Sequence, residues 1–220
     1  GSLWAMGYNH YGQLGDGTTI STSTPEEILT NGVTAIAAGF ECSLFLKSDG
    51  SLWAVGYNQY GELGDGTSGG SISSPKEIIT NGITAITIGD YHSLFLKSDG
   101  SLWAMGDNDY GCLGDGTTTE RDTPVQIVSS SVTAIAAGVN HSIFLKSDGS
   151  LWAMGYNYFG QLGDGTGNDQ YVSEQIVPFI PNILGISLCG ANLILKEGKQ
   201  WVVRRNILCA DEHEHNIASE

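Results

Sequence analysis

The sequence GSLWAMGYNHYGQLGDGT, residues 1–18, recurs almost unchanged three more times along this chain of 220 residues. The later copies begin at Gly50, Gly100 and Gly149. Five tryptophans mark the repeat at spacings of 49, 50, 49 and 49 residues: Trp4, Trp53, Trp103, Trp152 and Trp201. A fixed period near 50 residues is typical of an array of one supersecondary unit, so shared residues are expected to build the unit. Functional residues are therefore sought where the copies differ.

Each unit is predicted to hold four short strands. In residues 26–56 these are 26–29, 33–38, 43–47 and 51–55. Asp49-Gly50 between the last two is a strong hairpin signal, and a type I′ turn needs positive φ at both central residues. Helices are not expected, because no 3.6-residue periodicity persists and glycine interrupts each stretch. Small residues at 35–39 suit the crowded inner strand of a radial blade, so the chain is predicted to be an all-β propeller.

The repeats resemble those of the regulator of chromosome condensation family. The match is carried by G-x-x-[H/C]-S-L-F-L-K-S-D-G-S-L-W-A-x-G-x-N-x-x-G-x-L-G-D-G-T at residues 39–67 and by its next two copies. The resemblance implies a propeller, usually of seven blades, closed by a strand exchanged between its ends. It also implies action through loops, because family members include a nucleotide exchanger for a nuclear small GTPase and bacterial β-lactamase inhibitory proteins.

The number of units bears on ring closure. Repeats start near residues 1, 50, 100 and 149, with the fourth degenerate, and the array is predicted over 1–203 with a non-repeat tail at 204–220. Seven units of about 50 residues need about 350. Counted from Glu26, four sets of four strands leave the N-terminal strand spare, so the two ends share a phase. About four blades are expected, as an open arc, a fragment of a larger ring or a small closed ring. Because the sequence opens on a repeat without methionine, it is expected to begin within the array.

Acidic residues outnumber basic ones. Asp plus Glu number 24 and Lys plus Arg 9, which gives a net charge of −15. This charge disfavours nucleic acid and anionic membrane surfaces, because both require Lys and Arg to neutralise phosphates. It favours a basic protein partner, and open sheet edges add possible self-association. A mean hydropathy of −0.05 fits a soluble globular chain, with no signal peptide or apolar run long enough to span a bilayer, and the compartment is left open.

Residues that could carry chemistry match no recognised site. Each LGDGT element offers one aspartate, too few for calcium, and it is expected to bond turn N–H groups. His92 and His141, with Cys42 in phase, recur without a partner group and are expected to pack or bond the backbone. The tail cluster at 209–215 fits no standard zinc pattern, and no nucleophile elbow or P-loop is present. The chain is therefore expected to be no enzyme and to hold no cofactor or metal.

Candidate binding residues follow each motif asparagine or precede each SLFLK-like strand, and the loops 18–24, 68–74, 117–123 and 167–173 also vary. Aromatic residues beside acids recur there, and exposed aromatic rings are favoured as interface anchors. The alternative is that Tyr11 and its counterparts wedge between blades as core. Asp107 breaks the series of Tyr8, Tyr57 and Tyr156, which indicates an exposed position. The candidates are Tyr8, His10, Tyr11, Phe40, Glu41, Tyr57, Tyr60, Asp90, Tyr91, Asp107, Asp109, Tyr110, Asn140, Tyr156, Tyr158 and Phe159.

The predicted function is non-catalytic protein binding through this face. The alternative is guanine-nucleotide exchange on a small GTPase, which rests on the resemblance alone because no residue can be assigned to it. Chromatin or DNA binding comes last, since the net charge opposes it.

Overall fold

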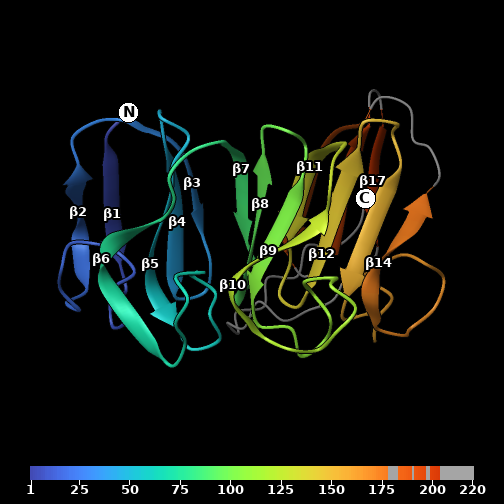
Figure 1. Cartoon of the computed structure of the whole chain (residues 1–220), viewed down its shortest axis with the longest axis horizontal. Coiled ribbons are helices and arrows are strands. Elements are labelled where there is room, and N and C mark those ends of the chain that lie inside the picture. The colour runs from blue at the N-terminus through green and yellow to red at the C-terminus, as the bar shows by residue number, and fades with distance from the viewer. Residues whose placement is uncertain (178–182, 190, 197–198, 204–220) are drawn as a thin grey trace, which may run out of the picture.

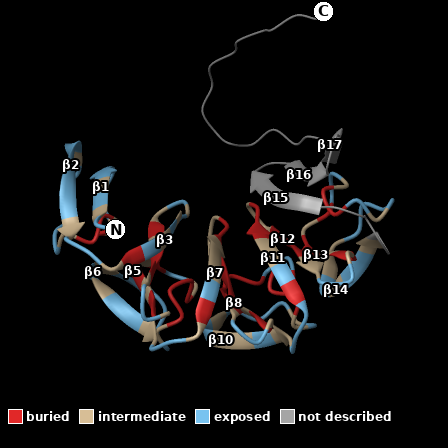
Figure 2. Cartoon of the chain, turned by 90° about the horizontal axis from the view of Figure 1, so that it is seen from above, coloured by how far each residue is buried: buried red, intermediate tan, exposed pale blue. Residues whose placement is uncertain are grey.

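The computed structural model is an open arc of antiparallel sheets (Figures 1 and 2). It describes residues 1–177, 183–189, 191–196 and 199–203, with side chains described to residue 176. All elements in this part of the chain are strands, and within it no helix is long and apolar enough to cross a membrane. The predicted all-β propeller is confirmed, as an arc whose ring is not closed.

Three complete blades form the middle of the arc, and each runs from its inner to its outer strand in chain order. The first contains β3 (Val33–Ala38), β4 (Cys42–Lys47), β5 (Leu52–Asn58) and β6 (Gly70–Ile79). The second contains β7 (Ile83–Ile88), β8 (His92–Lys97), β9 (Leu102–Gly106) and β10 (Arg121–Val128). The third contains β11 (Val132–Ala137), β12 (His141–Lys146), β13 (Leu151–Gly155) and β14 (Gln170–Val177).

Incomplete sheets lie at the two ends of the arc. The N-terminal sheet has only β1 (Leu3–Gly7) and β2 (Thr22–Leu29). The C-terminal sheet has β15 (Ile183–Cys189), β16 (Ala191–Lys196) and β17 (Lys199–Val203). Both tryptophan strands, β1 and β17, occupy the third position of a blade, so the predicted shared phase of the ends is confirmed.

The predicted division into units was wrong by one strand. The strand expected at 26–29 pairs with β1, with Trp4 opposite Glu27, and therefore closes the preceding blade. No N-terminal strand is spare. The turn at Asn31-Gly32 connects blades, so strands that are neighbours in sequence across it belong to different sheets.

The Asp-Gly hairpins are present, but their turns differ from the expected type. In the first blade the Gly50 N–H donates to the Lys47 carbonyl at 2.9 Å, and only Gly50 has positive φ, at 79°. A type I′ turn would need positive φ at the preceding residue too, whereas a type I turn followed by a left-handed glycine gives a G1 bulge. The carboxylate of Asp49 accepts the Ser51 N–H at 2.9 Å, and this side-chain bond also stabilises the turn.

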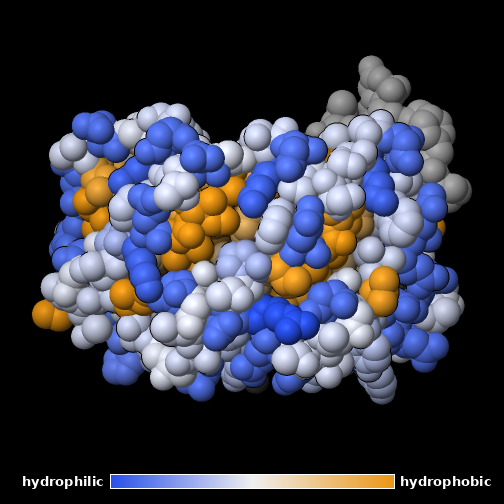
Figure 3. All heavy atoms as spheres, in the orientation of Figure 1, coloured by the Kyte–Doolittle hydropathy of each residue, from blue (hydrophilic) through white to orange (hydrophobic). Residues whose placement is uncertain are grey.

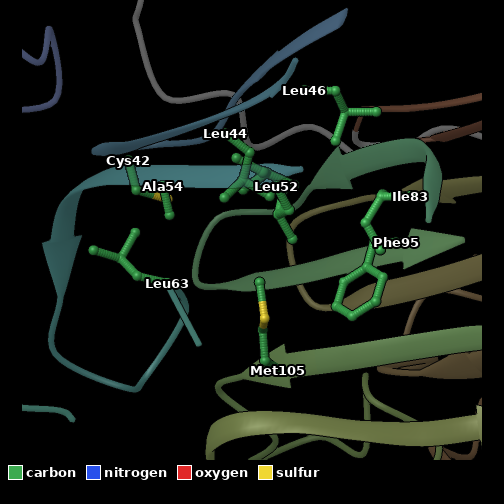
Figure 4. Close-up of a cluster of buried hydrophobic side chains, with 10 residues drawn as sticks. Cys42, Leu44, Leu46, Leu52, Ala54, Leu63, Ile83, Phe95 and Met105 are labelled. Atoms are coloured by element: carbon green, nitrogen blue, oxygen red, sulfur yellow. The ribbon is translucent and has the colours of Figure 1, made fainter. Parts of the chain in front are cut away.

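The hydrophobic core lies between neighbouring blades. Leu44 and Leu52 of the first blade pack with Ile83, Phe95 and Met105 of the second (Figure 4). A matching cluster joins the second and third blades. Each blade therefore needs its neighbour to bury its apolar face, as expected for a repeat array. On the face seen in Figure 3, apolar residues form separate patches among hydrophilic ones, and one of these patches lies over β1.

Each complete blade also stacks its tryptophan between two side chains. In the second blade Phe95 lies parallel to Trp103, with ring centroids 6.2 Å apart, and Lys97 Nζ lies 4.0 Å from the Trp103 centroid. The indole N–H of Trp103 donates to Ser101 at 2.9 Å. The first and third blades repeat this arrangement, which explains the shared S-x-F-x-K and S-x-W patterns: Phe45, Lys47, Ser51, Trp53, Phe144, Lys146, Ser150 and Trp152.

Candidate binding face

One end of the arc gathers the segments that follow the first and third strand of each blade. These strands run in the same direction, towards the lower edge in Figure 1, so their loops meet at one end of the propeller. We call this end the loop face. All of the sequence-predicted binding residues belong to these loops or to the last residues of β5.

A buried asparagine shapes each long segment of the loop face. Asn108 has no exposed surface. Its amide nitrogen donates to Asp115 at 3.1 Å and to the Thr117 carbonyl at 3.0 Å, and its oxygen accepts the Leu113 N–H at 3.0 Å. Asn9, Asn58 and Asn157 make the corresponding bonds. The aspartate of LGDGT in turn accepts the N–H two residues on, as predicted for a turn residue.

Replacing Asn108 with alanine should destabilise the fold by about 2 kcal/mol, because a buried backbone N–H and the Asp115 carboxylate each lose a partner. Urea unfolding of the variant measures this. Thr118→Ala is the control, since Thr118 is exposed in the same loop and should shift stability little. Equal effects of the two changes would contradict the organising role of the asparagine.

Four tyrosines of the first two blades and the strand before them pack together on the loop face. Tyr11 and Tyr57 have ring centroids 4.7 Å apart, Tyr57 and Tyr91 lie 6.1 Å apart, and Tyr60 and Tyr91 lie 5.2 Å apart. All four are half-buried. We call Tyr11, Tyr57, Tyr60 and Tyr91 the tyrosine cluster. Its margin is formed by Tyr8, His10 and Phe40, all exposed.

A second aromatic group joins loops of the second and third blades. Tyr110 and Tyr156 have ring centroids 4.8 Å apart, and Tyr158 and Phe159 are also 4.8 Å apart. Tyr158 is 70% exposed. At the repeat position of Tyr8, Tyr57 and Tyr156 the second blade has Asp107, and therefore no aromatic ring.

Carboxyl groups adjoin the tyrosine cluster and are partly withdrawn from water. Burial raises the pKa of Asp90 and of Asp107. Burial also raises the pKa of Glu41, although His10 nearby acts in the opposite direction. Tyr91 has its pKa raised by burial and by the charges of Asp90 and Glu41.

Glu62 is the most perturbed of these acids. It has no exposed surface, and burial raises its pKa to about 7, with the nearby charge of Asp107 adding to the rise. Its Oε2 accepts the Tyr60 N–H at 2.9 Å, whereas its Oε1 is buried without a hydrogen-bond partner. Glu62 is not among the sequence-predicted site residues, because an exchange of Gln for Glu between repeats is typical of a surface position. Cys112 in the same phase was the available signal, since cysteine is among the most buried residue types.

The cations with described side chains are all engaged away from the tyrosine cluster. Lys76 pairs with Asp65 at 2.7 Å, and Arg121 pairs with Asp115 at 2.6 Å. The three lysines that remain lie over blade tryptophans: Lys47, Lys97 and Lys146. The acids of the tyrosine cluster therefore have no Lys or Arg partner among the residues with described side chains.

Some sequence predictions about these residues need correction. Asp107 is buried, not exposed, because its Oδ1 turns inward to accept the Asp109 N–H at 3.0 Å. The core alternative for the aromatic series holds in part: Tyr11 and Tyr60 are half-buried, whereas Tyr110 and Phe159 are exposed. Of the other candidates, Asp109 is exposed and Asn140 is half-buried.

His92, His141, Cys42 and Cys112 are buried within the blades. His92 is fully buried, and its Nε2 bonds Ser142 Oγ of the next blade at 2.9 Å. Burial lowers the pKa of His92 to about 3, so it is neutral near pH 7. Cys42 and Cys112 are buried free thiols. No group of three metal-ligating side chains occurs within the described part, and the cluster at 209–215 lies outside it.

Comparison with known proteins identifies the repeats. The family model described as Regulator of chromosome condensation (RCC1) repeat matches residues 1–46, 49–96 and 99–145, more than half of the chain. The chain belongs to the RCC1-repeat family. A second model of the same repeat matches residues 33–62, 83–112 and 132–161. No curated protein matches the sequence.

Several solved structures have a similar fold. Human WBSCR16 superposes with a TM-score of 0.74 at 24% identity, over 87% of this chain and 52% of that chain. Prp20p from Saccharomyces cerevisiae superposes with a TM-score of 0.76 at 24% identity, over 87% of this chain and 50% of that chain. The same yeast protein in complex with Kap60 gives 0.76 at 20% identity, over 92% and 52%. The chain thus spans about half the length of these structures.

Proposed function

We propose that this RCC1-repeat chain is a non-catalytic interaction protein whose tyrosine cluster binds a basic segment of a partner protein. The observation that carries the proposal is the union of four packed tyrosines with the half-buried acids Glu41 and Asp90, and with no Lys or Arg among the described side chains to pair them. A face with unpaired, partly buried acids is complementary to a cationic partner.

The chemistry of the tyrosine cluster suits lysine or arginine side chains. A cation placed over the face of a tyrosine ring is stabilised by about 0.5–2 kcal/mol, and the stabilisation is larger where water is excluded. The same cation lowers the cost of ionising the half-buried carboxyls beside it, since an opposite charge within a few ångströms favours the charged form. Aromatic anchors of this kind dominate many interfaces, so a few tyrosines should carry most of the affinity.

Titration of a labelled lysine- and arginine-rich peptide, followed by fluorescence anisotropy, tests the proposal. We expect saturable binding that weakens as salt is added, because dissolved ions screen the attraction between the cationic peptide and the acidic loop face. Tyr91→Ala should reduce the affinity by about tenfold or more. Tyr158→Ala is the matched control, because Tyr158 is exposed on the third blade and its removal leaves the tyrosine cluster intact. Equal affinity of the Tyr91→Ala variant and the unchanged chain would refute the proposal.

Nucleotide exchange remains the alternative class. The yeast relative Prp20p is described together with its binding properties to Gsp1p and histones, which concerns that protein. In this chain no residue of the loop face can be assigned to release of a nucleotide. We expect the rate of nucleotide release from a small GTPase to stay unchanged when the chain is added. Faster nucleotide release would instead support an exchange activity.

A further inference from the structure

Large apolar side chains that are exposed gather in two places within the described part of the chain. One set lines the groove between the N-terminal sheet and the first complete blade. Apart from Ile20, all the others lie where the loops of the second and third blades meet. We call them the outer patch: Tyr110, Tyr158, Phe159, Tyr171 and Val172. An exposed apolar patch of this kind is typical of an interaction surface.

The outer patch is continuous across the boundary between the two blades. Tyr110 of the second blade and Tyr156 of the third have ring centroids 4.8 Å apart, and Tyr156 stacks on Tyr158 at 6.4 Å. Tyr171 lies directly against Gly111, the residue after Tyr110, because a Cβ added to this glycine would meet the tyrosine ring. The patch therefore offers one surface to a ligand.

The other complete blades have polar residues at three positions of the outer patch. Tyr158 corresponds to Gln59 in the first blade and to Asp109 in the second. Tyr158, Tyr171 and Val172 are 70%, 46% and 61% exposed, so none of them contributes to the core. The third blade thus exposes apolar surface that the fold does not require. The counterparts of Tyr171 and Val172 pack on the same glycines of the preceding loop: Ser73 and Ser74 in the first blade, Asp122 and Thr123 in the second.

Carboxyl groups connect the outer patch to the tyrosine cluster. Asp109, next to the outer patch in sequence, donates its N–H to Asp107 at 3.0 Å. The exposed Glu120 lies near both, since burial raises its pKa and the charges of Asp107 and Asp109 add to the rise. Asp107 also acts on Glu62, whose Oε2 accepts the N–H of Tyr60 in the tyrosine cluster. Neither Asp109 nor Glu120 has a Lys or Arg partner among the described side chains, so this path is complementary to a cationic segment.

We propose that the outer patch binds an apolar side chain of the same basic segment that the tyrosine cluster holds, so that one extended segment crosses the loops of the three complete blades. This inference rests on the proposed function and specifies the partner further. The segment has lysine or arginine at the tyrosine cluster and along Asp109 and Glu120, and a large apolar residue at the outer patch. Two linked contacts strengthen binding, because the first raises the effective concentration for the second.

Two peptides of about 16 residues, which reach about 50 Å when extended, test the inference by fluorescence anisotropy. Both have the same central block of lysine and arginine, flanked by glycine and serine. One peptide has leucine at both ends, so that the direction of binding does not matter, and the other has serine there. We expect the leucine peptide to bind about tenfold more tightly than the serine peptide.

The first blade supplies matched variants of the outer patch: Tyr158→Gln, Tyr171→Ser and Val172→Ser. The triple variant should fold, because these residues occupy the same positions in the first blade. It should lower the affinity for the leucine peptide to that for the serine peptide and leave the affinity for the serine peptide unchanged. Ile20→Ser is the control, since it removes a side chain that is 73% exposed outside the outer patch and should alter neither affinity.

The two proposals fail in different ways. Equal affinities for the two peptides, or a leucine advantage that the triple variant retains, would overturn the inference, while binding that Tyr91→Ala weakens would still support the proposed function. Binding of the leucine peptide that is insensitive to Tyr91→Ala would also overturn the inference, because the outer patch would then act apart from the tyrosine cluster. Binding of neither peptide would refute the proposed function, and the inference with it.

Discussion

Replacing Gly106 with alanine should destabilise the protein by at least about 4 kcal/mol, or prevent folding. Gly106 has φ of 106°, a conformation that costs a residue with a side chain about 1–2 kcal/mol. An added Cβ would also meet the Tyr91 carbonyl oxygen and lie 2.9 Å from His92 Cα and 3.1 Å from Glu62 Cα. These are backbone positions at the start of β8 and in the loop after β5, so relief of the clash requires a shift of the backbone in two blades.

Gly7 offers a matched control for this prediction. It occupies the same repeat position and has φ of 115°, but an added Cβ would meet no atom within 4 Å. Gly7→Ala should therefore cost only the conformational part, about 1–2 kcal/mol. Urea unfolding of both variants separates the two contributions. Similar losses in the two variants would contradict the close backbone approach at Gly106.

Replacing Glu62 with glutamine should stabilise the protein near pH 8 by on the order of 3 kcal/mol. The folded-state pKa of Glu62 is about 7, above the unfolded value of 4.5, because burial penalises the charge. Between pH 4.5 and about 7 the Glu62 carboxyl is therefore protonated in the folded state and ionised in the unfolded state. The stability of the unchanged protein should therefore fall as pH rises from about 4.5 to about 7 and then level off. Glutamine removes this dependence.

The repeats provide both a precedent and a control for the Glu62 prediction. At the same position Gln13 and Gln161 accept the backbone N–H two residues earlier, each at 3.1 Å, as Glu62 does. Gln161→Glu should therefore introduce a loss of stability above about pH 5 in the third blade. Thermal unfolding midpoints across pH measure both variants. An unchanged pH profile of the Glu62→Gln variant would contradict a buried, protonated carboxyl.

Local sequence signals predicted the parts of the fold that depend on short-range chemistry. The inner strand over 33–38 was predicted with its observed bounds, and the strand at 43–47 lacked only Cys42. The Asp-Gly turn and the alternating apolar residues were sufficient to predict these strands, because both signals act within one hairpin. The strand predicted at 26–29 was assigned to the wrong blade, since the choice between pairing with β1 and joining the blade of β3 depends on contacts between segments distant in sequence.

The sequence predicted which aromatic residues form the candidate site, but not which of its acids are buried. Repeat differences led to Tyr57, Tyr60 and Tyr91, which lie together because first- and third-strand loops share one end of the propeller. Burial of Asp107 and Glu62 could not be deduced from position alone, because acids usually mark the surface. The bonds of the shared asparagines were not predicted either, because residues common to all repeats were expected only to build the scaffold.

Zero-length carbodiimide cross-linking of the chain to the lysine-rich peptide, mapped by mass spectrometry, tests most directly whether the tyrosine cluster is the binding site. The proposal expects linkage at the loop-face acids Glu41, Asp90 and Asp109, and loss of that linkage in the Tyr91→Ala variant. The exposed acids of the outer strands should remain unlinked: Glu26, Glu77 and Glu174. Linkage mainly at the outer-strand acids would contradict the assignment of the binding site to the tyrosine cluster.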